Sequence, residues 1–303
     1  MMAFITCLRS RTVSASWEYH VWLLQRTLES ILAQLEREIM VIVVCHEIPA
    51  VSQLKDPRVE AFSVDFAPPL KRNDEMCADK VLKLTVGIDR AIERGCDYVM
   101  FADGDDLVSN RISEFVCAHH GVDGWYSASE YFYRYGGRLV YRYDVPELQA
   151  GPNLILRADL VRFASVADSR GRWFEIARSP ANEGYLNALR NRGPRVCTAA
   201  AVGHTQYLRL LKSECVDIHA LPFTSSIVIQ HPDSTSNVSG GDGSGASVVS
   251  SAQSVLRRRL RRGEQIIKRL RNVRPVTNRL RSEFSLLSPK QVPLSYRNHG
   301  LPF

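Results

Sequence analysis

The stretch Asp97-Tyr-Val-Met-Phe-Ala-Asp-Gly-Asp-Asp106 decides how this chain is interpreted. Residues 98–102 carry no charge, and they run into three carboxylates within four positions, Asp103, Asp105 and Asp106. A short apolar run that follows a helical pattern is typical of a buried strand in a parallel sheet. Ligands of open α/β sheets bind beyond the carboxyl ends of the strands, which is where these acids fall.

Three carboxylates so close together repel one another, and a bound cation would let them all stay ionised. Carboxylate oxygens suit Mg²⁺ or Mn²⁺, and Mg²⁺ is commonly held by one or two carboxylates together with substrate phosphates. A second interpretation needs no ligand, because Asp-Gly is a common turn pair and acids often cap a following helix, here one starting near Ser109. A phosphatase is a third interpretation, although that chemistry usually places its aspartates on the first strand.

The residues around this stretch alternate between strand and helix patterns. Four apolar runs predict strands, at residues 4–8, 39–45, 59–66 and 98–102. Helical periodicity predicts two longer helices, at residues 17–36 and 76–94. This βαβ order predicts an α/β fold with a mostly parallel, doubly wound sheet flanked by helices.

Polar residues follow each of these strands and are expected along one edge of the sheet: Arg9, Glu47, Asp65 and the acids from Asp103 to Asp106. A nucleotide pocket is expected at such an edge. No GxGxxG follows the first strand and no Walker A loop occurs in the sequence, which disfavours NAD enzymes and P-loop enzymes.

Further elements are predicted after the acids. Residues 124–143 alternate aromatic and polar side chains around Gly136-Gly137, which is typical of a β-hairpin. Its aromatic face suits a half-buried sheet, with a sugar-stacking acceptor wall as the alternative. The remaining predicted elements are a helix at 109–119, a strand and helix at 153–163, a helix at 182–191, and strands at 196–202 and 226–230.

The composition is that of a globular protein, with 45% hydrophobic and 23% charged residues among 303. No run of 18 apolar residues occurs, and the N-terminus lacks the basic flank and apolar core of a secretory signal. The seven cysteines are scattered without a CxxC pair, which is typical of reduced thiols. These features predict a cytoplasmic protein.

The net charge of +7 is concentrated near the C-terminus. Eleven Lys or Arg and one acid lie between Arg257 and Arg281, which leaves 28 basic and 31 acidic residues elsewhere. We therefore expect a body at residues 1–237, a flexible Gly/Ser-rich linker at 238–253 and a basic amphipathic helical extension at 254–303. Such a C-terminal arm suits peripheral binding to the anionic inner face of a membrane. A solvated or oligomerising helix is the alternative, and the acidic body makes nucleic acid an unlikely partner.

The order of elements over residues 3–235, the acid after the second strand and the Asp-rich motif resemble the GT-A glycosyltransferases, especially those of family 2. The resemblance implies a GT-A-like fold and the transfer of a sugar from a nucleotide-diphosphate-sugar, with UDP-sugars favoured. It implies an inverting reaction at a hydroxyl of a glycan or lipid-linked acceptor. It also implies Mg²⁺ or Mn²⁺ at the Asp-x-Asp motif, which would stabilise the leaving pyrophosphate as a Lewis acid.

The resemblance also implies roles for individual residues. Asp103 and Gly104 would lie beside the donor ribose and the metal, Asp105 would bind the metal directly, and Asp106 would be a second ligand or support the first. The donor nucleoside and phosphates would be bound by residues at the other strand ends and on the helix over 76–94: Cys7, Arg9, His46, Glu47, Lys80 and Lys83. A solvated helix face is the alternative for both lysines.

Two features of the family are matched only in part. The family usually carries Glu-Asp or Asp-Asp at the start of a helix, where an acid deprotonates the acceptor. Here Glu183 is followed by Gly184, so Glu183 is the expected catalytic base, with Glu175 and Asp168 as alternatives.

The family often has a late histidine that completes the metal site. His231 directly follows a predicted strand and is the expected ligand, with His204 and His219 as alternatives.

Two other functions remain open on the sequence. A sugar-phosphate nucleotidyltransferase usually carries a Gly-rich loop with Arg and Lys after the first strand, whereas residues 8–14 contain Arg but no Gly. A non-catalytic glycosyltransferase-like domain could bind a membrane or polyanions through its basic arm, and Gly184 in place of the second acid favours it.

Overall fold

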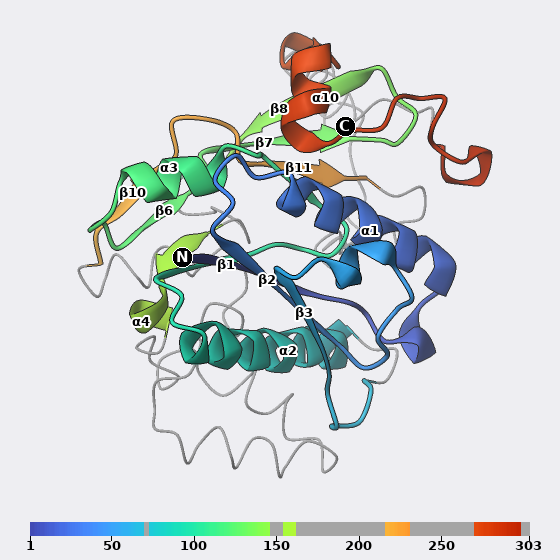
Figure 1. Cartoon of the computed structure of the whole chain (residues 1–303). Helices are drawn as coiled ribbons and strands as arrows, with labels where there is room; N and C mark the ends of the chain where they lie inside the picture. Colours follow the sequence, from blue (N-terminus) through green and yellow to red (C-terminus); the bar gives the residue numbers. More distant parts are fainter. Residues whose placement is uncertain (70–72, 146–153, 162–215, 231–269, 298–303) are drawn as a thin grey trace, which may run out of the picture.

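The computed structural model describes residues 1–69, 73–145, 154–161, 216–230 and 270–297 (Figure 1). Several predicted segments lie outside the described residues: the helix at 182–191, the strand at 196–202, the linker at 238–253 and the first part of the arm, 254–269.

A seven-stranded, mostly parallel sheet lies at the centre, with the strand order β10-β6-β9-β4-β1-β2-β3. Its strands are β1 (Met2–Cys7), β2 (Ile39–Cys45), β3 (Val59–Ser63), β4 (Tyr98–Phe101), β6 (Gly124–Tyr126), β9 (Ile155–Arg157) and β10 (Ile218–Ala220). β1 to β4 run parallel, and β9 is antiparallel to both β4 and β6. The predicted α/β fold class is confirmed, as are the four predicted strands before the acids.

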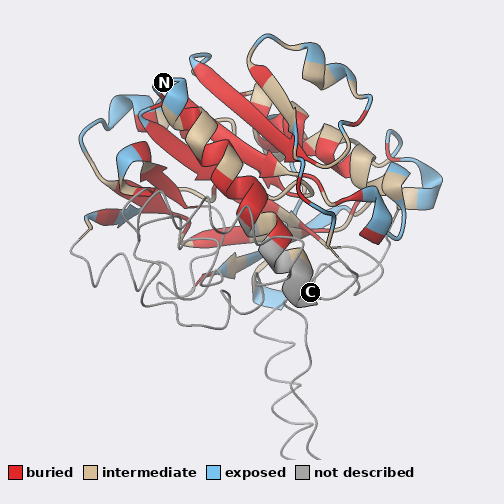
Figure 2. Cartoon of the chain, turned by 90° about the horizontal axis from the view of Figure 1, so that it is seen from below, coloured by how far each residue is buried: buried red, intermediate tan, exposed pale blue. Residues whose placement is uncertain are grey.

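Two long helices cover opposite faces of this sheet, α1 (Trp17–Leu32) and α2 (Asn73–Glu93) (Figure 1). Because β-strand side chains alternate between faces, β1 packs Phe4 against the α1 side and Ile5 against the α2 side. Figure 2 shows the resulting continuous buried interior. α2 approaches β1 so closely that a Cβ on Gly87 would lie 2.4 Å from Ile5 Cγ2, which requires glycine there.

A second sheet of five strands extends the fold, in the order β12-β8-β7-β11-β5. Its strands are β5 (Leu107–Val108), β7 (Ser129–Tyr133), β8 (Leu139–Asp144), β11 (Ser226–Ile229) and β12 (Val273–Pro275). β7 and β8 form the predicted hairpin, and Gly136 turns it with a φ of 86°. Shorter helices complete the fold: α3 (Ile112–Ala118), α4 (Ala158–Val161), α10 (Asn278–Phe284), and the 3₁₀ turns η1 (Arg11–Val13), η2 (Ser52–Lys55) and η6 (Leu294–Tyr296).

Residues 270–297, which the sequence assigns to the basic arm, pack into the folded body. β12 pairs antiparallel with β8, and Figure 1 shows α10 beside β7 and β8. Phe284 of α10 is completely buried in a cluster that also contains Leu23 of α1 and Tyr133 of β7. The second sheet therefore gets part of its core from this segment. Among the described residues, no helix is long and apolar enough to cross a membrane.

We expect Phe284→Ala to lower the free energy of unfolding by about 3–5 kcal/mol, because it empties a buried aromatic site. The matched control is Leu294→Ala in the same segment, which is 79% exposed in the wild type and should change stability by less than about 0.5 kcal/mol. Urea unfolding of the full chain measures both. Equal, small effects of the two variants would show that the segment does not pack as described.

Candidate functional site

The carboxyl ends of β1, β2 and β4 meet at one edge of the central sheet. In register, Cys7 lies opposite Val44, and Ile5 lies opposite Phe101. A Cβ on Gly104 would lie 2.8 Å from the Cys7 carbonyl oxygen, so the loop of aspartates passes directly over the end of β1. Only glycine allows this close approach, which brings the acids to the parallel-strand edge where ligands of α/β sheets bind.

Asp103 meets a cation from α2 at this edge. The Lys80 ammonium lies 2.5 Å from Asp103 Oδ1, and the Lys80 side chain is 32% exposed. Burial opposes the charged form of Lys80, but the carboxylates of Asp103 and Asp105 raise its pKa above the ordinary value. The ammonium is therefore held charged at the surface of the edge, where an anionic ligand can reach it.

Asp106 turns away from the edge into the protein. Its carboxylate accepts a hydrogen bond from the Ile229 backbone N–H of β11 at 3.2 Å, and the residue is buried. Burial, followed by the negative charges of Asp105, Asp103 and Glu130, raises the pKa of Asp106 well above its usual range. Asp103 and Asp105 are half-buried, so the three acids of the motif do not share one environment.

The segment that follows the acids is fixed from three sides. The Val108 N–H donates to Ser30 Oγ of α1 at 3.1 Å, and the Ser109 N–H donates to the Ser225 carbonyl at 2.8 Å. The Ser109 hydroxyl donates to Glu283 Oε1 of α10 at 2.7 Å. Gln34 adds a fourth contact by donating from Nε2 to the Ser109 carbonyl at 2.8 Å. These anchors hold the acidic loop on a rigid base.

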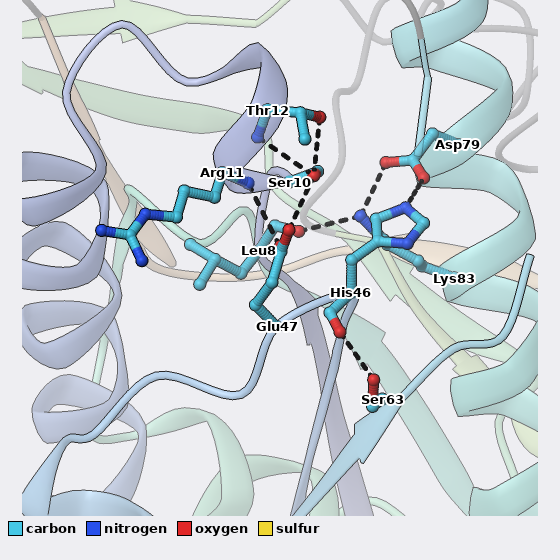
Figure 3. A network of polar contacts seen from close by, with 9 residues as sticks. All are labelled: Leu8, Ser10, Arg11, Thr12, His46, Glu47, Ser63, Asp79 and Lys83. Atoms are coloured by element: carbon cyan, nitrogen blue, oxygen red, sulfur yellow. Dashed lines mark hydrogen bonds and ion pairs between the residues drawn. The ribbon is translucent and has the colours of Figure 1, made fainter. Parts of the chain in front are cut away.

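A buried ion network lies beside the acids on the α2 side of the edge (Figure 3). The Lys83 ammonium donates to Asp79 Oδ2 at 2.7 Å and to the Leu8 carbonyl at 2.9 Å, and its side chain is only 1% exposed. Asp79 Oδ1 also contacts His46 Nε2 at 2.6 Å. Lys83 thus uses its charge inside the fold, while Lys80 on the same helix faces the edge.

Glu47 joins the loops that follow β1 and β2 (Figure 3). Its two carboxylate oxygens accept from the Ser10 hydroxyl at 3.2 Å and from the Arg11 backbone N–H at 3.1 Å. Arg9, half-buried, lies in the same loop. Burial raises the pKa of the Cys7 thiol at the end of β1 to about 11, so this thiol stays protonated.

The predicted site residues fall into two groups. One group lies at the same edge of the fold, although the side chains of Lys83 and Asp106 are buried there: Cys7, Arg9, His46, Glu47, Lys80, Lys83, Asp103, Gly104, Asp105 and Asp106. The other group lies outside the described residues: Glu183, Glu175, Asp168, His231 and His204. His219 lies on β10, the outermost strand on one side of the central sheet and separated from β4 by two strands, where it pairs with Asp217 at 3.1 Å.

Some anchoring residues carry no signal in the sequence. Ser30 and Gln34 are completely buried polar residues on or just after α1, and Glu283 is a single acid within a basic segment. Their contacts join residues more than seventy positions apart, so neither local periodicity nor a motif could identify them.

Asp103 and Asp105 are the residues at this edge that could hold a divalent cation together with a substrate. Within the described parts of the chain, no three His, Cys, Asp or Glu side chains converge as a complete metal site. Asp103 and Asp105 are both half-buried, whereas Asp106 is buried. Mg²⁺ is commonly held by one or two carboxylates together with substrate phosphates, and this pair matches that pattern.

No family model and no curated protein sequence matches the chain. Among solved structures, it is similar to TarS from S. aureus, with a TM-score of 0.39 and 13% identity over 76% of this chain and 37% of TarS. It is also similar to a cytidylyltransferase from Leptospira borgpetersenii (TM-score 0.36, 13% identity, 74% of this chain and 76% of the other). A third similar structure is a 4-diphosphocytidyl-2C-methyl-D-erythritol synthase from Anaerococcus prevotii. Its TM-score is 0.39 and its identity 11%, over 73% of this chain and 86% of the synthase. Likenesses this distant assign neither a family nor an activity.

We predict that Asp79→Ala lowers the free energy of unfolding by about 3–5 kcal/mol, because it leaves the buried Lys83 ammonium without its carboxylate. The double variant Asp79→Ala/Lys83→Met should recover much of that loss, since it removes both charges together. Denaturant unfolding of the two single variants and the double variant gives the coupling energy. If the two single effects on the free energy of unfolding simply add in the double variant, Asp79 and Lys83 do not stabilise each other as an ion pair.

A second prediction concerns pH. The folded state binds the Asp106 proton more tightly than the unfolded chain does, so the contribution of Asp106 to stability is complete below about pH 3.9 and is lost as the pH rises through the raised pKa. Asp106→Asn cannot ionise, and its stability should therefore fall less than that of the wild type between acid and neutral pH. Urea midpoints in metal-free buffer test this, with exposed Asp97→Asn as the control. Parallel curves for wild type and Asp106→Asn would contradict it.

Proposed function

We propose that this chain is a metal-assisted glycosyltransferase that uses a nucleotide-diphosphate-sugar donor, with UDP-sugars favoured, and acts on a hydroxyl of a glycan or lipid-linked acceptor. The observation that carries the proposal is the pairing of Asp103 with Lys80 at the carboxyl ends of parallel strands, next to Asp105. Adjacent acids and a cation are what a nucleoside diphosphate needs, because its phosphates bind both metal ions and ammonium groups.

The described residues take distinct parts in this proposal. Asp103 and Asp105 would hold Mg²⁺ or Mn²⁺, which supplies charge stabilisation to the leaving diphosphate when bound. The Lys80 ammonium would exchange Asp103 for a phosphate oxygen, since it is the half-exposed lysine of the two on α2. Asp106 would stay inside and fix the loop through its bond to β11.

The nucleoside would lie where the loops after β1 and β2 are joined. Glu47 joins these loops through its contacts with Ser10 and Arg11. The Lys83–Asp79–His46 network adds buried contacts to the same two loops. Preformed loops of this kind lower the entropy cost of ordering a binding site. Glu183 remains the proposed catalytic base, and inversion remains the proposed stereochemical course.

Calorimetric titration of the full chain with UDP, GDP and their sugars, with and without Mn²⁺, tests the proposal. We expect metal-dependent binding of one nucleotide, weakened at least about 100-fold by Asp105→Asn, because even outer-shell partners of metal ligands contribute roughly 10- to 100-fold. Lys80→Met should weaken binding with or without metal. Asp97→Asn, at the opposite end of the same strand, is the matched control and should bind as the wild type does.

Two results would redirect the assignment. If no nucleotide binds, the acids from Asp103 to Asp106 are best explained as a structural turn without a ligand. Release of pyrophosphate from a nucleoside triphosphate and a sugar phosphate, without sugar transfer from a nucleotide-sugar, would instead define a nucleotidyltransferase.

A further inference from the structure

The margin of the second sheet carries an unusual concentration of positive charge. Residues 270–297 contain six Lys or Arg and a single acid, Glu283, which is bound to Ser109. Five arginines of this margin are exposed, on the edge strand β12, on its partner β8, next to these strands, or on α10: Arg138, Arg142, Arg271, Arg274 and Arg279. We call this surface the basic ribbon.

Backbone pairing brings the segments that carry these arginines next to one another along this margin. The Val276 N–H donates to the Arg138 carbonyl at 2.9 Å, and the Arg142 N–H donates to the Asn272 carbonyl at 2.9 Å. The turn of the β7–β8 hairpin therefore lies beside the start of α10, and the other end of β8 lies beside residue 272. Figure 1 shows β8 and α10 together at the top of the molecule, on the side away from α2.

The charge of the ribbon is largely uncompensated within the described part of the chain. Arg142 pairs with Asp144 at 3.3 Å, and both side chains are about half exposed or more. Arg274 donates hydrogen bonds from one guanidinium nitrogen to the carbonyl oxygens of Arg271 and Val273. Among the described residues, no carboxylate forms an ion pair with Arg138, Arg271, Arg274 or Arg279, so these exposed charges are available to an anionic partner.

Two leucines point to the kind of partner. Leu139 is 37% exposed and Leu270 is 50% exposed, and each directly follows or precedes an exposed arginine of the ribbon. They are two of the few large apolar side chains that the described residues leave exposed. An anionic bilayer surface can bind both kinds of side chain, because its phosphates bind arginines and its interface takes up apolar side chains. A soluble polyanion binds only the arginines.

From this surface we propose that the folded ribbon, and not only the arm that precedes it, docks the protein onto an anionic lipid bilayer. Arg138, Arg271 and Arg279 contact lipid phosphates, and Leu139 and Leu270 enter the interface between the headgroups. The proposal is independent of the nucleotide site, because none of these residues lies among the acids or lysines of the central edge.

Sedimentation of the full chain with vesicles tests the proposal. The wild type should bind vesicles that contain phosphatidylglycerol and not vesicles of phosphatidylcholine alone, and added salt should weaken the binding. The triple variant Arg138→Gln/Arg271→Gln/Arg279→Gln should bind on the order of 100-fold more weakly, because each basic residue contributes roughly fivefold. The matched control, Arg37→Gln/Lys55→Gln/Arg94→Gln, removes the same charge from exposed positions on other elements and should bind nearly as the wild type does.

A leucine variant distinguishes lipid from soluble polyanions. Leu139→Ser/Leu270→Ser should weaken vesicle binding and leave binding to inorganic polyphosphate unchanged. Equal vesicle binding by the wild type and the arginine variant would overturn the proposal and leave residues 254–269 as the attachment. The proposal would also be overturned, in favour of a soluble polyanion, by a different pair of results. In that case the leucine variant would bind vesicles as the wild type does, and the arginine variant would lose binding to both vesicles and polyphosphate. Circular dichroism melting and UDP titration of each variant show separately whether the fold and the nucleotide site are intact.

Discussion

The fixed position of Ser109 is the constraint on which the candidate site depends. Its backbone and hydroxyl bind Ser225 beside β11, Gln34 at the end of α1 and Glu283 of α10, so elements from three distant parts of the sequence meet at one buried residue. Three residues earlier, Asp106 binds β11 through its carboxylate. These contacts restrict the conformations of the acidic loop. They therefore also restrict the positions of Asp103 and Asp105.

The electrostatics of the edge follow from this arrangement. Asp106 is buried and near other acids, so its proton is held tightly, while Asp103 is neutralised by Lys80 at the surface. Lys83 and Asp79 form a second, interior pair that supports the loops after β1 and β2. One pair lies where a ligand can reach it and the other where it cannot. This separation assigns binding to Lys80 and support to Lys83 in the proposed function.

The C-terminal segment links the site to the rest of the molecule. Residues 270–297 supply Phe284 to the core, Glu283 to the anchor of the acidic loop and arginines to the surface of the second sheet. Removal of the whole arm from residue 254 onward would therefore open a buried cluster and release the acidic loop together with the basic surface. Point variants on the ribbon separate these roles, because they leave the buried contacts in place.

The sequence by itself determined the alternation of strands and helices, because uninterrupted apolar runs and helical periods are local properties of the chain. It also placed polar residues at the ends of the parallel strands, including the acids from Asp103 to Asp106. Only the tertiary structure decided which way each side chain faces. Lys80 and Lys83 lie three residues apart on α2, yet one is half-exposed beside Asp103 and the other is buried against Leu8, since helix rotation and the close packing over β1 place them differently. The burial of Asp106 and the docking of residues 270–297 likewise depend on contacts between distant segments, which local sequence patterns do not encode.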